Sequence, residues 1–286
     1  MSKPKNVFRA LPQCGVALVA VLWIVAALSI VVTSISSSVR QEIKAVSASR
    51  QSVVSEALGQ AAIGLVLQDL SSRPDRGQAL SLVDTVYKET PVRVRVLPLT
   101  GLIDINNASP ALLARLFRYA GVDAKQAEAL AAAAVEWRSA KDGRGRPIGF
   151  EAPEDLLRVR GVDYTLYARL AELVTADIQG NGRVSPPAAT DAVLSVLALD
   201  NAALLAGRPM ERNATRALTD TTSLNGEFTD SNAQTQRYQL QARVPLAGGS
   251  WLLVSRTVDF SGGRDGLRWR TIHADARFEP APGEGS

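Results

Sequence analysis

The stretch that most constrains the fold is an uncharged apolar run, Gly15–Val32, near the start of the chain. Beyond it, apolar residues recur about every 3.5 positions among polar ones, which is the spacing of an amphipathic helix. These residues are Val39, Ile43, Val46, Val53 and Leu58. No glycine or proline lies between Val16 and Leu58, so nothing obliges a helix to end with the apolar run. We therefore expect one helix from Gly15 to Leu70, ~80 Å long at a rise of 1.5 Å per residue.

The charges before this run predict its orientation in a membrane. Lys3, Lys5 and Arg9 precede it, and no acidic residue does. Positive charge beside an apolar span stays on the cytoplasmic side. The run is short for a spanning helix, but the uncharged Thr33–Ser38 segment extends it. We expect a single-pass protein of the inner membrane of a Gram-negative cell, with a cytoplasmic N-terminus and a periplasmic remainder.

Three interpretations of this start stay open. The run is a secretory signal cut near Ser36–Ser38, a plain anchor, or a processed helix that remains in place. Gly15, behind a short basic leader and directly before the run, resembles the type IV prepilin signal, whose peptidase cuts after the glycine. The amphipathic continuation favours this third interpretation. The resemblance to the prepilin signal implies cleavage between Gly15 and Val16 and methylation of Val16. Most pilin-like proteins have Phe and Glu at the first and fifth mature positions, where this chain has Val16 and Ala20.

Composition excludes several classes of function. Cys14 is the only cysteine and precedes the run, so we expect no disulfide within the chain, no cysteine–metal framework and no lipidation there. His273 is the only histidine, which excludes histidine-rich zinc sites and is best read as an ordinary strand residue. The net charge of +4 falls to +1 without the three leader charges, so it does not indicate a nucleic-acid-binding face. We expect no enzyme activity, cofactor or metal.

Two regions have the alternation of β-strands. Pro91–Pro98 alternates apolar and polar residues, with Arg93 and Arg95 on a solvated face, and Leu102–Ile105 is expected to return as its hairpin partner. Near the C-terminus, the segments 238–244, 251–259 and 267–273 are expected to form an antiparallel meander. Joining both regions in one sheet packed on the N-terminal helix gives an α+β fold.

The intervening region is predicted to be helical. Ser109 followed by Pro110 is a strong helix start signal. We expect helices at 111–119, 123–139, 156–160 and 164–174, then a linker at 181–190 and a helix at 191–205. Gly121 and Gly161 are placed to end helical turns. Residues 211–231 are polar and are assigned only as a candidate second, degenerate helical repeat.

Two turns in this region resemble helix-hairpin-helix or SAM-like modules. DNA-binding versions hold a phosphate with a Gly-x-Gly hairpin at a helix N-terminus. Here the turns read Gly121-Val-Asp123 and Gly161-Val-Asp163, with an acidic residue at the second glycine position. The segment 102–180 has ten Lys and Arg against eleven Asp and Glu, so it carries no net positive charge. DNA binding is therefore disfavoured, and a membrane-anchored DNA-binding protein of the competence type is the alternative hypothesis.

Along nearly its whole length the chain resembles the K family of minor pseudopilins of the type II secretion system. The resemblance rests on the order of several segments that follow a pilin-like helix, in which Ala20 stands where most pilin-like proteins have glutamate. These are the 92–105 hairpin, Asp104-Ile-Asn-Asn-Ala-Ser-Pro110, Val135-Glu-Trp-Arg138, Leu156-Leu-Arg-Val-Arg-Gly161, Tyr167-Ala-Arg-Leu170 and Val174-Thr175.

The resemblance implies an assembly role at the tip of the pseudopilus. The implied partners are the I and J minor pseudopilins, the prepilin peptidase, the inner-membrane assembly platform and, as a further class, secreted protein substrates. It implies no nucleic-acid partner. Some family members bind calcium through acidic loops, but the corresponding loop here, Lys141–Arg146, is short and basic, so we predict no calcium there.

The resemblance also implies a domain organisation. A leader at 1–15 precedes the N-terminal helix at 16–72. The first strands of the pilin-like head follow at 73–105, then an inserted helical domain at 106–230. The C-terminal strands of the head are expected at 231–278, with a loose tail at 279–286.

Overall fold

The structure is a computed structural model, and it describes residues 14–176, 180–199, 224–246, 249–262 and 268–279. Side chains of residues 14–18 and 28–49 are outside this description. The chain divides into two compact units, residues 1–54 and 55–286. The expected leader and tail, and most of the candidate repeat at 211–231, lie outside the described residues.

The long N-terminal helix is confirmed. Helix α1 runs from Cys14 to Ser72 without interruption, against the expected Gly15–Leu70. Within residues 1–54, the apolar side chains from Val19 to Ala27 are exposed. From Ser55 onward, each turn of the helix buries the side chains of one face against the rest of the second unit.

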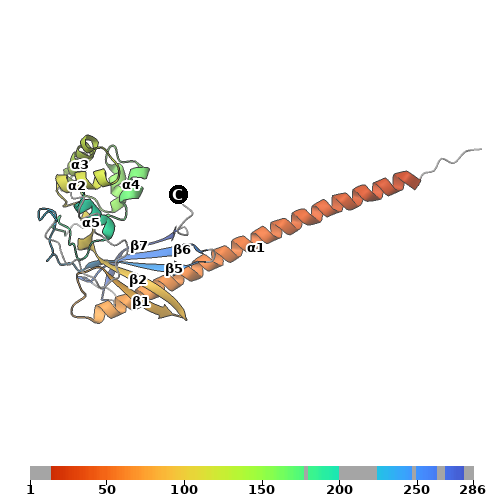
Figure 1. The fold of residues 1–286 in the computed structure, drawn as a ribbon, viewed down its shortest axis with the longest axis horizontal. Helices are drawn as coiled ribbons and strands as arrows, with labels where there is room; N and C mark the ends of the chain where they lie inside the picture. The colour runs from red at the N-terminus through yellow and green to blue at the C-terminus, as the bar shows by residue number, and fades with distance from the viewer. Residues whose placement is uncertain (1–13, 177–179, 200–223, 247–248, 263–267, 280–286) are drawn as a thin grey trace, which may run out of the picture. The chain divides into compact units, whose positions relative to one another are not determined.

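The second unit contains a five-stranded antiparallel sheet in the order β1-β2-β5-β6-β7 (Figure 1). Its strands are β1 (Ser81–Tyr87), β2 (Thr90–Pro98), β5 (Arg237–Pro245), β6 (Trp251–Asp259) and β7 (Arg270–Glu279). The expected joining of the first strand region to the C-terminal meander is confirmed, because β2 pairs with β5 from Arg93 to Pro98. The fold is α+β, as the patterns predicted.

One face of the sheet packs on the second half of α1. The α1 residues Ala62, Ile63, Val66, Leu67 and Leu70 share one buried cluster with the inward-facing rows of β2, β5 and β6. The strand rows alternate with polar residues because successive side chains of a strand point to opposite faces. At Gly59 the helix backbone lies close to the sheet, since a Cβ there would lie 2.6 Å from Val254 Cγ2. Removing these apolar groups from water stabilises the unit by about 1.5–3 kcal/mol for each large side chain.

The prediction that Leu102–Ile105 pairs with β2 as a hairpin is wrong. Residues Ile103–Asp104 form a short strand, β3, that pairs in parallel with β4 (Val174–Thr175) instead of with β2. The reason is that both edges of β2 are already occupied, by β1 on one side and β5 on the other. Strand β1 lies in the apolar piece at 79–87, to which the sequence patterns assigned no structure.

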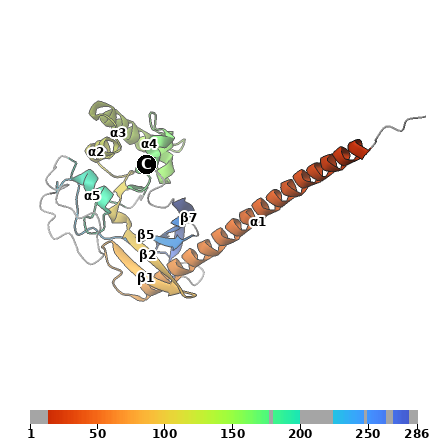
Figure 2. The same cartoon turned by 45° about the vertical axis from the view of Figure 1, so that its right-hand side comes forward.

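Between β2 and β5 the chain forms a helical block, whose helices lie together on one side of the sheet (Figures 1 and 2). Its elements are α2 (Pro110–Tyr119), α3 (Ala124–Ser139), the 3₁₀ helix η2 (Pro153–Arg158), α4 (Tyr164–Leu170) and α5 (Asp191–Leu197). A second buried cluster fills it, with Phe117, Leu156 and Leu194 fully enclosed. Helices α4 and α5 are shorter than expected: α4 ends before β4, and residues beyond Leu199 are outside the described part.

The segment expected to be a linker is instead part of the core. Val184, Ser185, Ala188 and Ala189 are buried, and the Ser185 amide donates to the Thr100 carbonyl oxygen at 2.7 Å. A Cβ at Gly101 would lie only 2.2 Å from the Ala188 carbonyl oxygen, so the two backbones touch. The proline and glycine content of this segment correctly indicates irregular backbone. Irregular backbone can still be buried when its N–H and C=O groups are hydrogen-bonded, as they are here.

The last strand is longer and later than expected. Strand β7 covers Arg270–Glu279, whereas the pattern placed it at 267–273. A β-bulge near Ile272 shifts the pairing, since Val258 faces Thr271 and Thr257 faces His273. The bulge breaks the alternation on which the sequence prediction depended.

Two glycines on α1 provide a matched test of this packing. We expect Gly59→Ala to lower the free energy of unfolding by about 1–3 kcal/mol, because the new methyl group overlaps Val254. Gly64→Ala, where nothing lies within 4 Å, should raise it by about 0.5–1 kcal/mol through helix propensity. Urea unfolding of the full chain in detergent, followed by tryptophan fluorescence, measures both. Equal effects of the two substitutions would contradict the packing described here.

Candidate functional site

The expected processing residues lie in α1. Gly15, Val16 and Ala20 all fall within the helix, and the Ala20 side chain is exposed between Val19 and Val21. Only the backbone of Gly15 and Val16 is described, so their role in processing stays a prediction. The geometry adds only that the helix is already formed at the expected cleavage position.

One described helical segment, Arg50–Ser72, is long and apolar enough to cross a membrane. Its buried face packs on the sheet, so we interpret it as a core helix. Half of the apolar run at Gly15–Val32, residues 15–18 and 28–32, lies outside the residues whose side chains the structure describes. Its membrane role therefore rests on its sequence.

The two acidic residues in the helical block are helix caps. Asp123 accepts a hydrogen bond from the Gln126 amide at 3.1 Å at the start of α3, and Asp163 accepts one from the Leu166 amide at 2.7 Å at the start of α4. The preceding glycines, Gly121 and Gly161, have φ of +91° and +95°. The turns thus have hairpin geometry, but carboxylates already accept the amide hydrogen bonds that a phosphate would take.

Three arginines of the block donate to backbone carbonyls within it. Arg169 reaches the Ala120 oxygen at 3.0 Å, Arg138 the Ile105 oxygen at 2.9 Å, and Arg115 the Leu197 oxygen at 3.1 Å. Burial lowers the pKa of Arg138, and the nearby Asp104 opposes this shift. These guanidinium groups connect the ends of neighbouring helices and strands within the block. Since they are used inside the block, the DNA-binding hypothesis is further weakened.

The loop Lys141–Arg146 is closed around its one carboxylate. Asp142 accepts hydrogen bonds from the Arg144 and Arg146 amides and from the Arg146 guanidinium. The amide bonds, that of Arg146 first, lower the pKa of Asp142. Among the described residues, no group of three or more His, Cys, Asp and Glu side chains is arranged to hold a metal ion. The absence of calcium stays a prediction.

Arg93 and Arg95 differ in environment although they share a strand face. Arg93 is solvated and pairs with Asp84 at 2.7 Å, as expected of an exposed face. Arg95 was also expected to be solvated, but burial lowers its pKa, and it donates to Gln241. The helical block covers this part of the sheet, which the strand pattern alone could not reveal.

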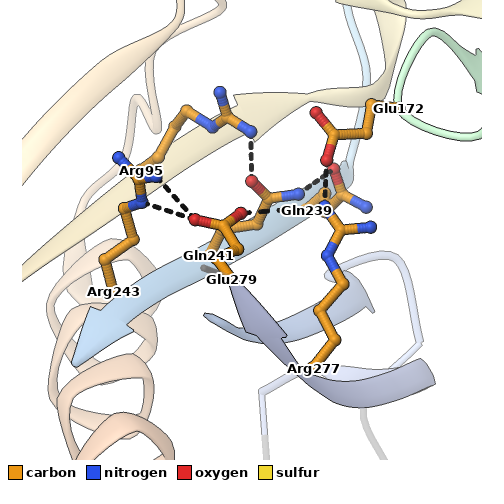
Figure 3. Close-up of polar contacts among 7 residues, drawn as sticks. All are labelled: Arg95, Glu172, Gln239, Gln241, Arg243, Arg277 and Glu279. Atoms are coloured by element: carbon orange, nitrogen blue, oxygen red, sulfur yellow. Dashed lines mark hydrogen bonds and ion pairs between the residues drawn. The ribbon is translucent and has the colours of Figure 1, made fainter. Parts of the chain in front are cut away.

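Arg95 belongs to a polar network on the sheet face opposite α1 (Figure 3). Gln241 accepts from Arg95 and donates to Gln239 at 3.1 Å. At one end of the network Arg243 pairs with Glu279 at 2.5 Å. At the other end Arg277 of β7 pairs with Glu172, which follows α4 and belongs to the helical block.

Beside this network lies a cleft of about 580 Å³ between β5–β7 and the helical block, which we call the sheet–block cleft. Its acidic lining residues are Glu151, Glu154, Glu172 and Asp275, and Arg237, Arg277 and His273 also line it. Burial, with the adjacent Glu154 carboxylate, raises the pKa of Tyr167 at one wall. Of the acidic and basic residues of this cleft, the sequence singles out only His273, which it predicts to be an ordinary strand residue. Tyr167 lies in a segment that carries the family resemblance, without a predicted role. A signal for the cleft in the sequence was the row of polar residues Gln239, Gln241 and Arg243 on β5. The same row is also expected of a strand face that is simply exposed to solvent, so it did not predict a cleft.

No protein-family model and no curated protein matches the chain. Among solved structures, it is similar to one chain of the crystal structure of the GspK-GspI-GspJ complex of the Type 2 Secretion System from enterotoxigenic Escherichia coli. The two chains are 14% identical, the similarity covers 83% of this chain and 98% of that chain, and the TM-score is 0.49.

The capping role of the acidic turns can be tested at α4. Asp163→Ala should lower the free energy of unfolding by about 1 kcal/mol, because the Leu166 amide loses its acceptor. Asp163→Asn should retain most of the stability, since an asparagine oxygen accepts the same bond. Thermal unfolding followed by circular dichroism compares the two variants. If both were as stable as the parent, the carboxylate would have no capping role.

Proposed function

We propose that this chain is a minor pseudopilin of the K type that sits at the tip of a type II secretion pseudopilus. The observation that carries the proposal is one continuous helix that begins with an uncharged apolar run and ends packed on an antiparallel sheet. The glycine directly before that run supports prepilin-type processing. The helical block between β2 and β5 supports the K type, because it adds bulk beside the sheet.

Ala20 supports the tip position by a physical argument. In pilin-like helices a glutamate at this position is thought to neutralise the terminal amine of the neighbouring subunit within the bilayer. Leaving a charge uncompensated in hydrocarbon is costly. A subunit without this glutamate suits a place where no neighbour's amine has to be met, and the first subunit of a fibre is such a place.

The proposed partners follow from this role. The chain would join the I and J minor pseudopilins to start pseudopilus assembly, after cleavage by the prepilin peptidase and with the inner-membrane platform. Its proposed location is the inner membrane, with the second unit in the periplasm. The role is not enzymatic, and the domain boundaries given from the sequence belong to the same proposal.

The DNA-binding alternative has little support from the geometry. Both hairpin turns end in capping aspartates, and three arginines of the block serve internal carbonyls. A gel-shift assay with the full chain in detergent should show no tight complex with duplex DNA at low salt. A tight complex that weakens steeply with salt would revive this alternative.

The processing step tests the proposal most directly. We expect the membrane-associated protein to begin at Val16 and to carry one methyl group on its terminal amine, as read by intact mass and N-terminal sequencing. Gly15→Leu should leave the leader attached, because a large side chain replaces the residue before the cut. A start near Val39 would instead indicate an ordinary secretory signal, and an intact Met1 a plain anchor.

A further inference from the structure

Strand β7 forms one edge of the sheet and is open on its outer side. It pairs with β6 along its inner side from Arg270 to Glu279. Within the described part of the chain, no strand pairs with its outer side. Eight of its ten residues are exposed, including Phe278 at 65%. An open edge of this length presents a row of backbone donors and acceptors to which another strand can bind.

The open edge adjoins the sheet–block cleft. His273, Asp275 and Arg277 of β7 line the cleft together with residues of η2 and α4. The β-bulge brings Ile272 to the cleft as well, beside His273. The ion pair between Arg277 and Glu172 connects the strand to the helical block at this place (Figure 3). A strand added to β7, about 4.8 Å away, would direct every second side chain toward this cleft.

Apolar side chains also stand exposed along the cleft. Tyr164 at the start of α4 is 75% exposed, Leu157 of η2 is 38% exposed and Ile272 is 49% exposed. Each of these three residues lines the cleft, and they come from three separate elements. They supply apolar contact area for the methylene groups of an occupant's long basic side chains, in addition to the backbone hydrogen bonds of the strand.

The cleft has an excess of negative charge. Its two arginines are already paired, Arg237 with Asp259 and Arg277 with Glu172. Glu151, Glu154 and Asp275 have no cationic partner among the residues that the structure describes. An occupant that brings positive charge would therefore be favoured, and an acidic one would be repelled.

We propose that the β7 edge and the sheet–block cleft together bind an extended segment of a partner protein in which basic and apolar residues alternate. The segment adds to β7 as a further strand, and its basic side chains meet Glu151, Glu154 and Asp275. A second copy of this chain fits less well. Its own β7 would bring Asp275 and Glu279 toward the acidic cleft. This inference does not depend on the proposed secretion role.

The test uses the full chain in detergent and a fluorescent ten-residue peptide of alternating lysine and valine. We expect binding by fluorescence anisotropy, and binding at least about tenfold weaker for the counterpart with glutamate in place of lysine. A lysine–valine peptide methylated on every backbone nitrogen should not bind, because it lacks the donors that pair with β7. Hydrogen exchange should slow at amides of 270–279 when the unmethylated peptide binds.

Charge-reversal variants locate the site. Asp275→Lys and Glu151→Lys should each weaken binding of the lysine–valine peptide at least about fivefold. Glu128→Lys, an equally exposed change on α3 outside the cleft, should leave binding unchanged. Two cleft variants are used because one of them alone could lose binding through misfolding. Thermal unfolding of each variant shows whether it is folded.

Four results would overturn the proposal. The first is equal binding of the lysine and glutamate peptides, and the second is retained binding of the methylated peptide. The third is that no peptide binds at about 1 mM, which means that any Kd is weaker than the value corresponding to about −4 kcal/mol. The fourth is a dimer of the chain, detected by sedimentation, that Asp275→Lys abolishes, because the edge would then serve a second copy.

Discussion

The packing of α1 on the sheet is the interaction on which the rest of the second unit depends. The buried row of β2, β5 and β6 packs mainly on the apolar face of α1, with Phe260 and Trp269 also in the cluster, so without the helix most of it would face water. The contact is close because Gly59 allows the helix backbone to approach Val254. The same helix carries the apolar run that we expect in the membrane, so one element joins the anchoring and the folding of the chain.

The opposite face of the sheet has different chemistry. There the helical block covers polar side chains, and Arg95 is half-buried with the amide of Gln241, not a carboxylate, as its direct partner. Burying a cation is costly unless hydrogen bonds and nearby charges compensate it. Gln241, with Glu172 and Glu279 at longer range, provides this compensation. This polar interface between the block and the sheet leaves room for the sheet–block cleft.

The features that the sequence predicts correctly are those that depend on residues close together in the chain. The period of α1, the Ser109 cap with Pro110, and the glycines at 121 and 161 are each set by neighbouring residues. The failures depend on distant residues. Leu102–Ile105 alternates as a strand should, but its partner β4 lies about 70 residues on, and the pattern cannot choose between partners. For the same reason, Asn181–Thr190 looked like a linker until its backbone partners at Thr100 and Leu80 were known.

The candidate site was the least predictable part. Its residues come from η1, η2, α4, β4, β5, β6 and β7. A few of them, such as Leu157 and Tyr167, lie in segments that carry the family resemblance, but no single motif predicts the cleft. His273 was noticed only because it is the only histidine. The bulge that brings Ile272 beside it depends on the pairing with β6, which the alternation of β7 alone does not encode.

The connection between β2 and β5 has a consequence for the order in which the chain folds. Pro98 and Tyr238 are neighbours in the sheet but lie roughly 140 residues apart in the chain, and closing such a loop costs about 4 kcal/mol more entropy than a two-residue hairpin. A helical block that has already folded shortens this loop, because the pairing of β3 with β4 joins residues that lie about 70 positions apart within it. The block therefore acts as a template for the sheet. Until the last fifty or so residues arrive during synthesis or export, β2 keeps an open edge on which the wrong strand could pair.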